Sequence, residues 1–163
     1  MRTVTTARSS SMRTGSPGFR PNCAISVASS TATFATSGIN NGLFCGTPSV
    51  SLGRNVGSKR ALDMLFTGQP IDAATALRDG LVSRVVPLDK LMEETLGAAL
   101  MICDYSQIAV MAAKESVNRA FEGSLSDGVM FERRLFHALF STQDQKEGMD
   151  AFMNKRTANF THQ

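Results

Sequence analysis

The 163-residue sequence has no acidic residue before Asp63. Residues 1–62 contain seven cations and no acid, a formal charge of +7, whereas the remaining ten cations and all 14 acids give residues 63–163 a charge of −4. The N-terminal cations, Arg2, Arg8, Arg13 and Arg20, are spaced among Ser and Thr, without the dense basic stripe of a nucleic-acid-binding protein. We therefore expect no nucleic-acid partner.

Cysteine and histidine are also scarce. The three cysteines, Cys23, Cys45 and Cys103, are odd in number and far apart, which excludes both a disulfide framework and a zinc site. Only two histidines are present, so metal catalysis has almost no ligands to use. We expect no metal site and buried thiols in a reducing compartment.

Long apolar runs are absent as well. The longest uncharged stretch, Pro21–Gly53, is interrupted by Ser, Thr, Asn and Gly. A membrane-spanning helix needs about 18 or more consecutive apolar residues. The sequence therefore predicts no membrane span.

The N-terminal segment 1–22 is predicted to be a tail. Gly15, Pro17, Gly18 and Pro21 oppose regular structure. An Arg-rich, Ser-rich and acid-free N-terminus is typical of an organelle transit peptide, although its apolar positions make only a weak amphipathic helix. A plain disordered tail has the same composition, so both interpretations stay open.

Small and β-branched residues dominate the next segment. They predict short strands near Ala24–Ala28 and Thr33–Ala35. The following segment, 37–57, contains five glycines, which predicts a loop with tight turns or a close approach of backbone to a ligand.

After Gly57 the pattern becomes helical. Ser58 is placed to cap a helix that ends at Gly68, and Asp72 to cap a second helix that ends at Gly80. Residues 81–86 predict a strand. Further helices are expected over residues 88–103, 106–121, 124–140 and 144–154. The helix over 124–140 is apolar on several faces, which indicates more than one packing neighbour, one of them in another subunit.

Several segments, in this order, resemble the crotonase (enoyl-CoA hydratase/isomerase) superfamily. Residues 64–87, MLFTGQPIDAATALRDGLVSRVVP, resemble its signature region. Residues 34–57 resemble the active-site loop of the subgroup with the mitochondrial enoyl-CoA hydratase domain-containing proteins and their bacterial relatives. Three further segments resemble the C-terminal helices of enoyl-CoA hydratases: residues 113–122, 131–136 and 144–160. The resemblance covers about residues 23–160.

This resemblance implies an α/β, crotonase-like (ClpP/crotonase spiral) fold, N-terminally truncated, with a helix-dominated C-terminal region. Three parts are expected: a basic tail or transit-like segment (1–22), a strand and Gly-rich active-site-loop remnant (23–57), and a helical C-terminal crotonase region (58–163). The family's missing half normally covers these helices, so their exposed apolar sides imply partners. We expect a homo-oligomer or hetero-assembly with crotonase-family chains, as trimer or hexamer. The implied location is mitochondrial, with a cytoplasmic one as the alternative.

The family's catalytic groups are missing. Enoyl-CoA hydration uses two carboxylates around a water and an oxyanion hole of two backbone N–H groups. The family acid positions fall at Gly18 and Gly38, neither of which can ionise. Near Gly15 the family's triple glycine is lost, and Pro17 has no N–H to donate. We therefore expect no catalytic residues and near-background hydration by this chain alone.

The positions that resemble a CoA site are retained. They comprise an acyl-site loop and a group at the nucleotide end of CoA: Gly42, Leu43, Phe44, Cys45 and Gly46, then Phe136, Phe152 and Lys155. A CoA thioester is the implied substrate or ligand, and no other cofactor is expected. The two phenylalanines are equally compatible with a core, and Lys155 with a helix end that favours cations. Two functions stay open: an enzyme of fatty acyl-CoA metabolism, or a non-catalytic CoA-binding or assembly partner of full-length homologues.

Overall fold

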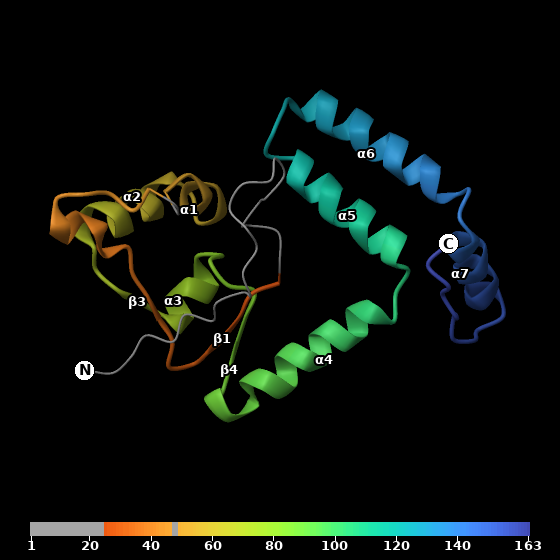
Figure 1. Ribbon diagram of the computed structural model, residues 1–163, viewed down its shortest axis with the longest axis horizontal. Coiled ribbons are helices and arrows are strands. Elements are labelled where there is room, and N and C mark those ends of the chain that lie inside the picture. The colour runs from red at the N-terminus through yellow and green to blue at the C-terminus, as the bar shows by residue number, and fades with distance from the viewer. Residues whose placement is uncertain (1–24, 47–48) are drawn as a thin grey trace. The chain divides into compact units, whose positions relative to one another are not determined.

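The computed structural model describes residues 25–46 and 49–163 (Figure 1). They fall into two compact units, Met1–Thr95 and Leu96–Gln163. The expected tail, with Gly18, Cys23 and the lost triple glycine, lies outside the described residues.

Four short strands make two small sheets in the first unit: β1 (Val27–Ser29), β2 (Thr33–Phe34), β3 (Ile71–Asp72) and β4 (Arg84–Val86). β1 pairs with β4 in parallel, and β2 pairs with β3 in antiparallel register. A small core of Ala28, Ala76 and Val82 packs against Phe34 and Ile71. The strand predicted near residues 33–35 is confirmed as β2, and the one near 24–28 is centred slightly later, at β1.

The loop predicted for residues 37–57 is partly wrong, because it contains the 3-10 helix η1 (Ser37–Asn41) and the helix α1 (Ser49–Asn55). α1 lies beside α2 (Ser58–Thr67) (Figure 1). Leu52 of α1 is buried in one cluster with Ala61 and Met64 of α2. This tertiary burial stabilises a helix despite its internal glycine.

The predicted cap at the start of α2 is also wrong. Gly57 occupies the N-cap position, with φ 79° and ψ 156°, and Ser58 is the first helical residue. Glycine tolerates this positive φ without steric cost. The predicted end is confirmed, since Gly68 has φ 63° and donates its N–H to the Met64 carbonyl.

Helix α3 (Ala73–Arg78) begins at its predicted cap. The Asp72 carboxylate accepts the Thr75 N–H at 2.8 Å, and this bond holds the pKa of Asp72 below its ordinary value. The strand predicted over residues 81–86 starts only at Arg84. Leu81 and Val82 instead donate their N–H groups to the Ala76 carbonyl, which closes the end of α3.

Helices dominate the rest of the chain, as predicted. A 3-10 turn, η2 (Leu88–Lys90), leads into α4 (Leu91–Cys103), which continues from the first unit into the second. Three helices follow: α5 (Gln107–Arg119), α6 (Leu125–Leu139) and α7 (Gln143–Met153). Ser106, Ser124 and Thr142 cap them by accepting backbone N–H groups three residues ahead.

Helix α6 packs on α5 and buries none of its own residues (Figure 1). Leu125 at its start is 84% exposed. The sequence predicted more than one packing neighbour for this helix, whereas within the described chain α5 is its one main neighbour. No single described helix is long and apolar enough to cross a membrane, and only the bent pair Leu88–Cys103 and Gln107–Arg119 passes that test together.

Candidate functional site

The predicted acyl-site loop, residues 42–46, follows η1 through a left-handed turn. Gly42 has φ 69° and donates its N–H to the Ile39 carbonyl, and Leu43 donates to the Gly38 carbonyl. Just before η1, the buried Thr36 hydroxyl donates to the Met64 carbonyl at 2.8 Å. The chain is therefore anchored to helix α2 just before η1.

Gly38, the predicted family acid position, lies against the acyl-site loop. Its N–H donates to the Cys45 sulfur at 3.2 Å, and the Ser49 hydroxyl donates to the Cys45 carbonyl. A Cβ atom on Gly38 would lie 3.0 Å from the Cys45 Sγ, 3.0 Å from the Phe44 carbonyl carbon and 3.1 Å from the Cys45 nitrogen. Such contacts are tighter than nearly all real Cβ contacts, so a side chain at residue 38 would require these neighbours to shift by a few tenths of an ångström.

The acyl-site loop turns its large apolar side chains to solvent. Leu43 is 69% exposed and Phe44 is 72% exposed. The Phe44 ring also lies beside Gly46, 3.5 Å from the place a Cβ would occupy there. Clustered exposed apolar side chains of this kind are suited to contact an acyl chain or another apolar surface.

The predicted nucleotide-end residues lie in the second unit. Phe136 is 57% exposed and stacks edge-to-face on Phe140, with ring centroids 5.3 Å apart. Phe152 is 78% exposed on the last turn of α7, and Lys155 donates its N–H to the Phe152 carbonyl at 3.3 Å. Neither phenylalanine belongs to the core of the described chain.

The predicted site residues thus fall into two groups, one within each unit. Gly38 and the acyl-site loop meet in the first unit, while Phe152 and Lys155 meet in the second. No group of three or more His, Cys, Asp or Glu able to hold a metal ion is present within residues 25–46 and 49–163.

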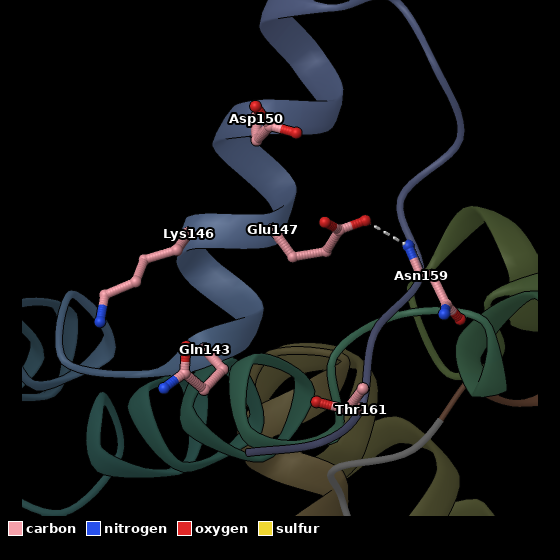
Figure 2. Close-up of a pocket in the computed structure, with 6 residues that line it drawn as sticks. All are labelled: Gln143, Lys146, Glu147, Asp150, Asn159 and Thr161. Carbon is pink, nitrogen blue, oxygen red and sulfur yellow. Dashed lines mark hydrogen bonds between the residues drawn. The ribbon is translucent and has the colours of Figure 1, made fainter.

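A polar groove beside α7 has no counterpart in the sequence prediction (Figure 2). Its volume is about 400 Å³, and six residues line it: Gln143, Lys146, Glu147, Asp150, Asn159 and Thr161. Glu147 faces Asn159 across it and accepts its N–H at 2.7 Å, while Lys146 points away (Figure 2). Hydrogen bonds from Arg156 and from the Asn159 N–H lower the pKa of Glu147 to about 2.

The segment after α7 folds back onto the start of that helix. The buried Asp144 carboxylate accepts the N–H groups of Thr161 and His162, at 2.8 and 3.1 Å. Burial alone would raise the pKa of Asp144, but the neighbouring Ser106 hydroxyl and these two N–H groups outweigh it, and the pKa is lowered. The Gln163 carbonyl accepts the N–H of Asp144, so the segment also satisfies the first turn of α7.

Comparison with known proteins identifies the family. The model of the enoyl-CoA hydratase/isomerase family matches residues 14–163. The chain belongs to this family. The predicted resemblance to the crotonase superfamily is thereby confirmed.

Two relatives illustrate the match. The chain is 52% identical, over 86% of its own length and 55% of the relative's, to "Probable enoyl-CoA hydratase" of Rhizobium meliloti. It is 45% identical to "Enoyl-CoA hydratase domain-containing protein 3, mitochondrial" of Xenopus laevis, over 86% of this chain and 48% of that one. The chain therefore spans about half the length of the curated relatives it matches.

Solved structures confirm the fold. An enoyl-CoA hydratase subunit I from Geobacillus kaustophilus superposes with a TM-score of 0.83 at 39% identity, covering 86% of this chain and 55% of that one. Human enoyl-CoA hydratase domain-containing protein 3 gives a TM-score of 0.79 at 40% identity, covering 83% and 54%. The predicted α/β crotonase-like fold, helix-rich toward the C-terminus, is correct.

Proposed function

We propose that this chain binds acyl-CoA thioesters of fatty acyl-CoA metabolism and does not hydrate enoyl-CoA on its own. The observation that carries the proposal is the packing at Gly38. Hydration needs one carboxylate to take a proton from water and another group to protonate the α-carbon. Residue 38 has no ionisable group, and a side chain there would require the backbone of residues 44 and 45 to shift.

Other acids early in the chain are committed to structure. Asp72 caps α3, and Asp79 forms ion pairs with Arg60 and Arg78. Asp63 pairs with Arg60 at 3.0 Å. These contacts hold the carboxylates away from a catalytic role, which supports a chain that binds without hydrating.

Binding is supported by the two groups of exposed side chains. Leu43 and Phe44 offer apolar surface to an acyl chain, which carries no hydrogen-bonding groups. Phe152 offers an aromatic face to adenine, and the Lys155 ammonium is suited to a phosphate. These three chemistries match the parts of a CoA thioester.

Association with other crotonase-family chains is the second candidate function. Helix α6 exposes Leu125 and Phe136, and the exposed Phe140 follows at its end. Surfaces of this kind usually mark protein–protein contacts.

We propose a mitochondrial location, which is supported by the Arg-rich segment 1–22 and by the mitochondrial names of the Xenopus laevis and Dictyostelium discoideum relatives.

One experiment tests binding and turnover together. The full chain is purified by size-exclusion chromatography, and the same fraction is used for both measurements. Hydration of crotonyl-CoA is followed by the loss of the enoyl thioester absorbance, and binding of crotonyl-CoA is measured by calorimetry. A full-length enoyl-CoA hydratase serves as the positive control. We expect binding without hydration. Hydration above background would overturn the loss of the active site, and absence of binding would overturn the binding function.

A substitution in the acyl-site loop tests its role in binding. Phe44→Ala is expected to weaken binding of a long-chain acyl-CoA about tenfold, on the scale of burying one phenylalanine. Val50→Ala, an equally exposed apolar truncation on α1, is the matched control. Neither variant should alter binding of free CoA. Equal losses from both variants would contradict a specific role for the loop.

A further inference from the structure

Lys155 has a backbone conformation that lysine rarely adopts. Its φ is 50°, in the left-handed region where a side chain is crowded by its own backbone. Among the described non-glycine residues only His162 shares a positive φ. A conformation of this kind persists only where surrounding contacts impose it.

The backbone at the end of α7 forms a Schellman motif. The Arg156 N–H donates to the Ala151 carbonyl at 3.0 Å, and the Lys155 N–H donates to the Phe152 carbonyl at 3.3 Å. Glycine is the usual residue at the left-handed position of this motif. Lysine at that position therefore requires an additional constraint.

Arg156 supplies that constraint through an ion-pair clamp onto α7. Its Nη1 donates to Glu147 Oε1 at 2.6 Å and its Nη2 to Glu147 Oε2 at 2.8 Å. The Nη2 also donates to Asp150. We call Glu147, Asp150 and Arg156 the Arg156 clamp. Because two parallel bonds fix a guanidinium in both position and orientation, the clamp determines how the chain leaves the helix.

The clamp leaves Lys155 as the free cation of this turn. Its exposed ammonium has no ion-pair partner in the part of the chain that the structure describes, whereas the Arg156 charge is neutralised by two carboxylates. Glu147 remains ionised at neutral pH, since its pKa is about 2. An anion approaching this turn therefore meets Lys155 as the unpaired cation.

We propose that the Arg156 clamp is a positioning device that holds Lys155 in its left-handed turn and so directs its side chain toward a phosphate of the CoA nucleotide. This rests on the proposed binding function. Glu147, Asp150 and Arg156 are positioning residues that act through Lys155 and do not touch the ligand. Opening the clamp releases the turn, and the backbone then no longer fixes the point from which the Lys155 side chain extends.

The sign of the effect separates positioning from simple electrostatics. Glu147→Gln removes a negative charge that is paired with Arg156, the residue next to Lys155, and by electrostatics alone this would strengthen binding of an anion. Positioning predicts the opposite, because a neutral amide holds the guanidinium less firmly. Glu115→Gln removes the same charge from an exposed site on α5, outside the clamp, and is the matched control.

The test measures binding of CoA and of pantetheine, which lacks the nucleotide, to the full chain by calorimetry. We expect Lys155→Gln to weaken CoA binding about tenfold, on the scale of one charge-assisted hydrogen bond. Glu147→Gln should weaken it about threefold, and Glu115→Gln should leave it unchanged. In the Lys155→Gln background, Glu147→Gln should have no further effect. Binding of pantetheine should be the same in all variants.

A further variant separates binding from stability. Lys155→Gly fits the left-handed turn better, so it should raise the thermal midpoint while it weakens CoA binding as Lys155→Gln does. Unchanged or tighter CoA binding by Glu147→Gln overturns the positioning role while Lys155→Gln still marks the CoA site. Unchanged CoA binding by Lys155→Gln instead overturns the proposed phosphate contact, and the positioning role with it.

Discussion

Alanine at residue 38 is expected to destabilise the first unit, because its Cβ would collide with the acyl-site loop. The nearest atoms are the Cys45 Sγ at 3.0 Å, the Phe44 carbonyl carbon at 3.0 Å and the Cys45 nitrogen at 3.1 Å. Two of the three belong to the backbone and cannot rotate away. Overpacking of this kind costs about 1–3 kcal/mol, and we expect Gly38→Ala to fall in that range.

Urea unfolding measures this cost, and hydrogen exchange in α1 and α2 assigns it to the first unit. Cys45→Ala removes the sulfur but leaves both backbone contacts, so it should recover less than half of the loss in the double variant. Gly53→Ala is the control in the same unit. Its Cβ would lie 4.0 Å from the Ala61 Cβ, an ordinary contact, and alanine is favoured over glycine in a helix by about 0.5–1 kcal/mol.

Two results would refute this reasoning. Gly38→Ala as stable as the wild type would show that the loop yields easily, so that a carboxylate could also fit. Full recovery by Cys45→Ala would show that the thiol alone fills the space. Either result would remove the steric basis for the proposed absence of hydration.

Three further changes are predictable from the structure. Met64→Ala empties a buried site between α1 and α2 and should lower the free energy of unfolding in urea by about 2–5 kcal/mol. A decrease as small as that of a surface substitution would contradict the burial of Met64 between these helices. Thr142→Ala removes the cap of α7 and should cost about 1 kcal/mol, with Thr142→Ser close to wild type. The Glu147 pKa falls from 4.5 to about 2 on folding, so its stabilisation is complete above pH 4.5 and is lost as the pH falls toward 2. Urea unfolding should show a steeper loss across that window for wild type than for Glu147→Gln, and parallel profiles would be inconsistent with the clamp.

Local sequence signals predicted the helices well. Asp72 accepts the Thr75 N–H as a cap should, and Gly68 ends α2 in a left-handed turn. These features depend on residues within one turn of one another, which a linear pattern contains. Gly57 in place of Ser58 at the start of α2 shows the remaining uncertainty of one residue.

Elements held by distant contacts were missed. α1 contains Gly53 and stands in a glycine-rich stretch, yet burial of Leu52 against Ala61 and Met64 keeps it helical. β3 is two residues long and is defined only by its pairing with β2. No local pattern carries either contact.

The candidate site also has features that the sequence shows and features that depend on distant contacts. The lack of a carboxylate at residue 38 is visible in the sequence, but the lack of space depends on the turn at Gly42, which brings Cys45 back onto Gly38. The clamp was missed because Arg156 lies beyond the end of the helix and reaches back nine residues to Glu147. The sequence did contain a signal for the clamp: a basic residue follows directly after a helix whose last turns carry acids.

The glycine at residue 38 and the close packing around it are coupled, and this determines what an acid introduced at that position could do. Cys45 accepts the Gly38 N–H on its sulfur and the Ser49 hydroxyl on its carbonyl, so the loop is stabilised in the conformation that crowds residue 38. Gly38→Glu would therefore have to displace backbone at residues 44 and 45 before its carboxylate could reach a water. Such a displacement would also redirect the exposed Phe44, which the proposed acyl contact requires. Gly38→Glu should accordingly restore no hydration of crotonyl-CoA and should weaken long-chain acyl-CoA binding, whereas hydration gained with binding retained would show that the loop accommodates the acid without moving.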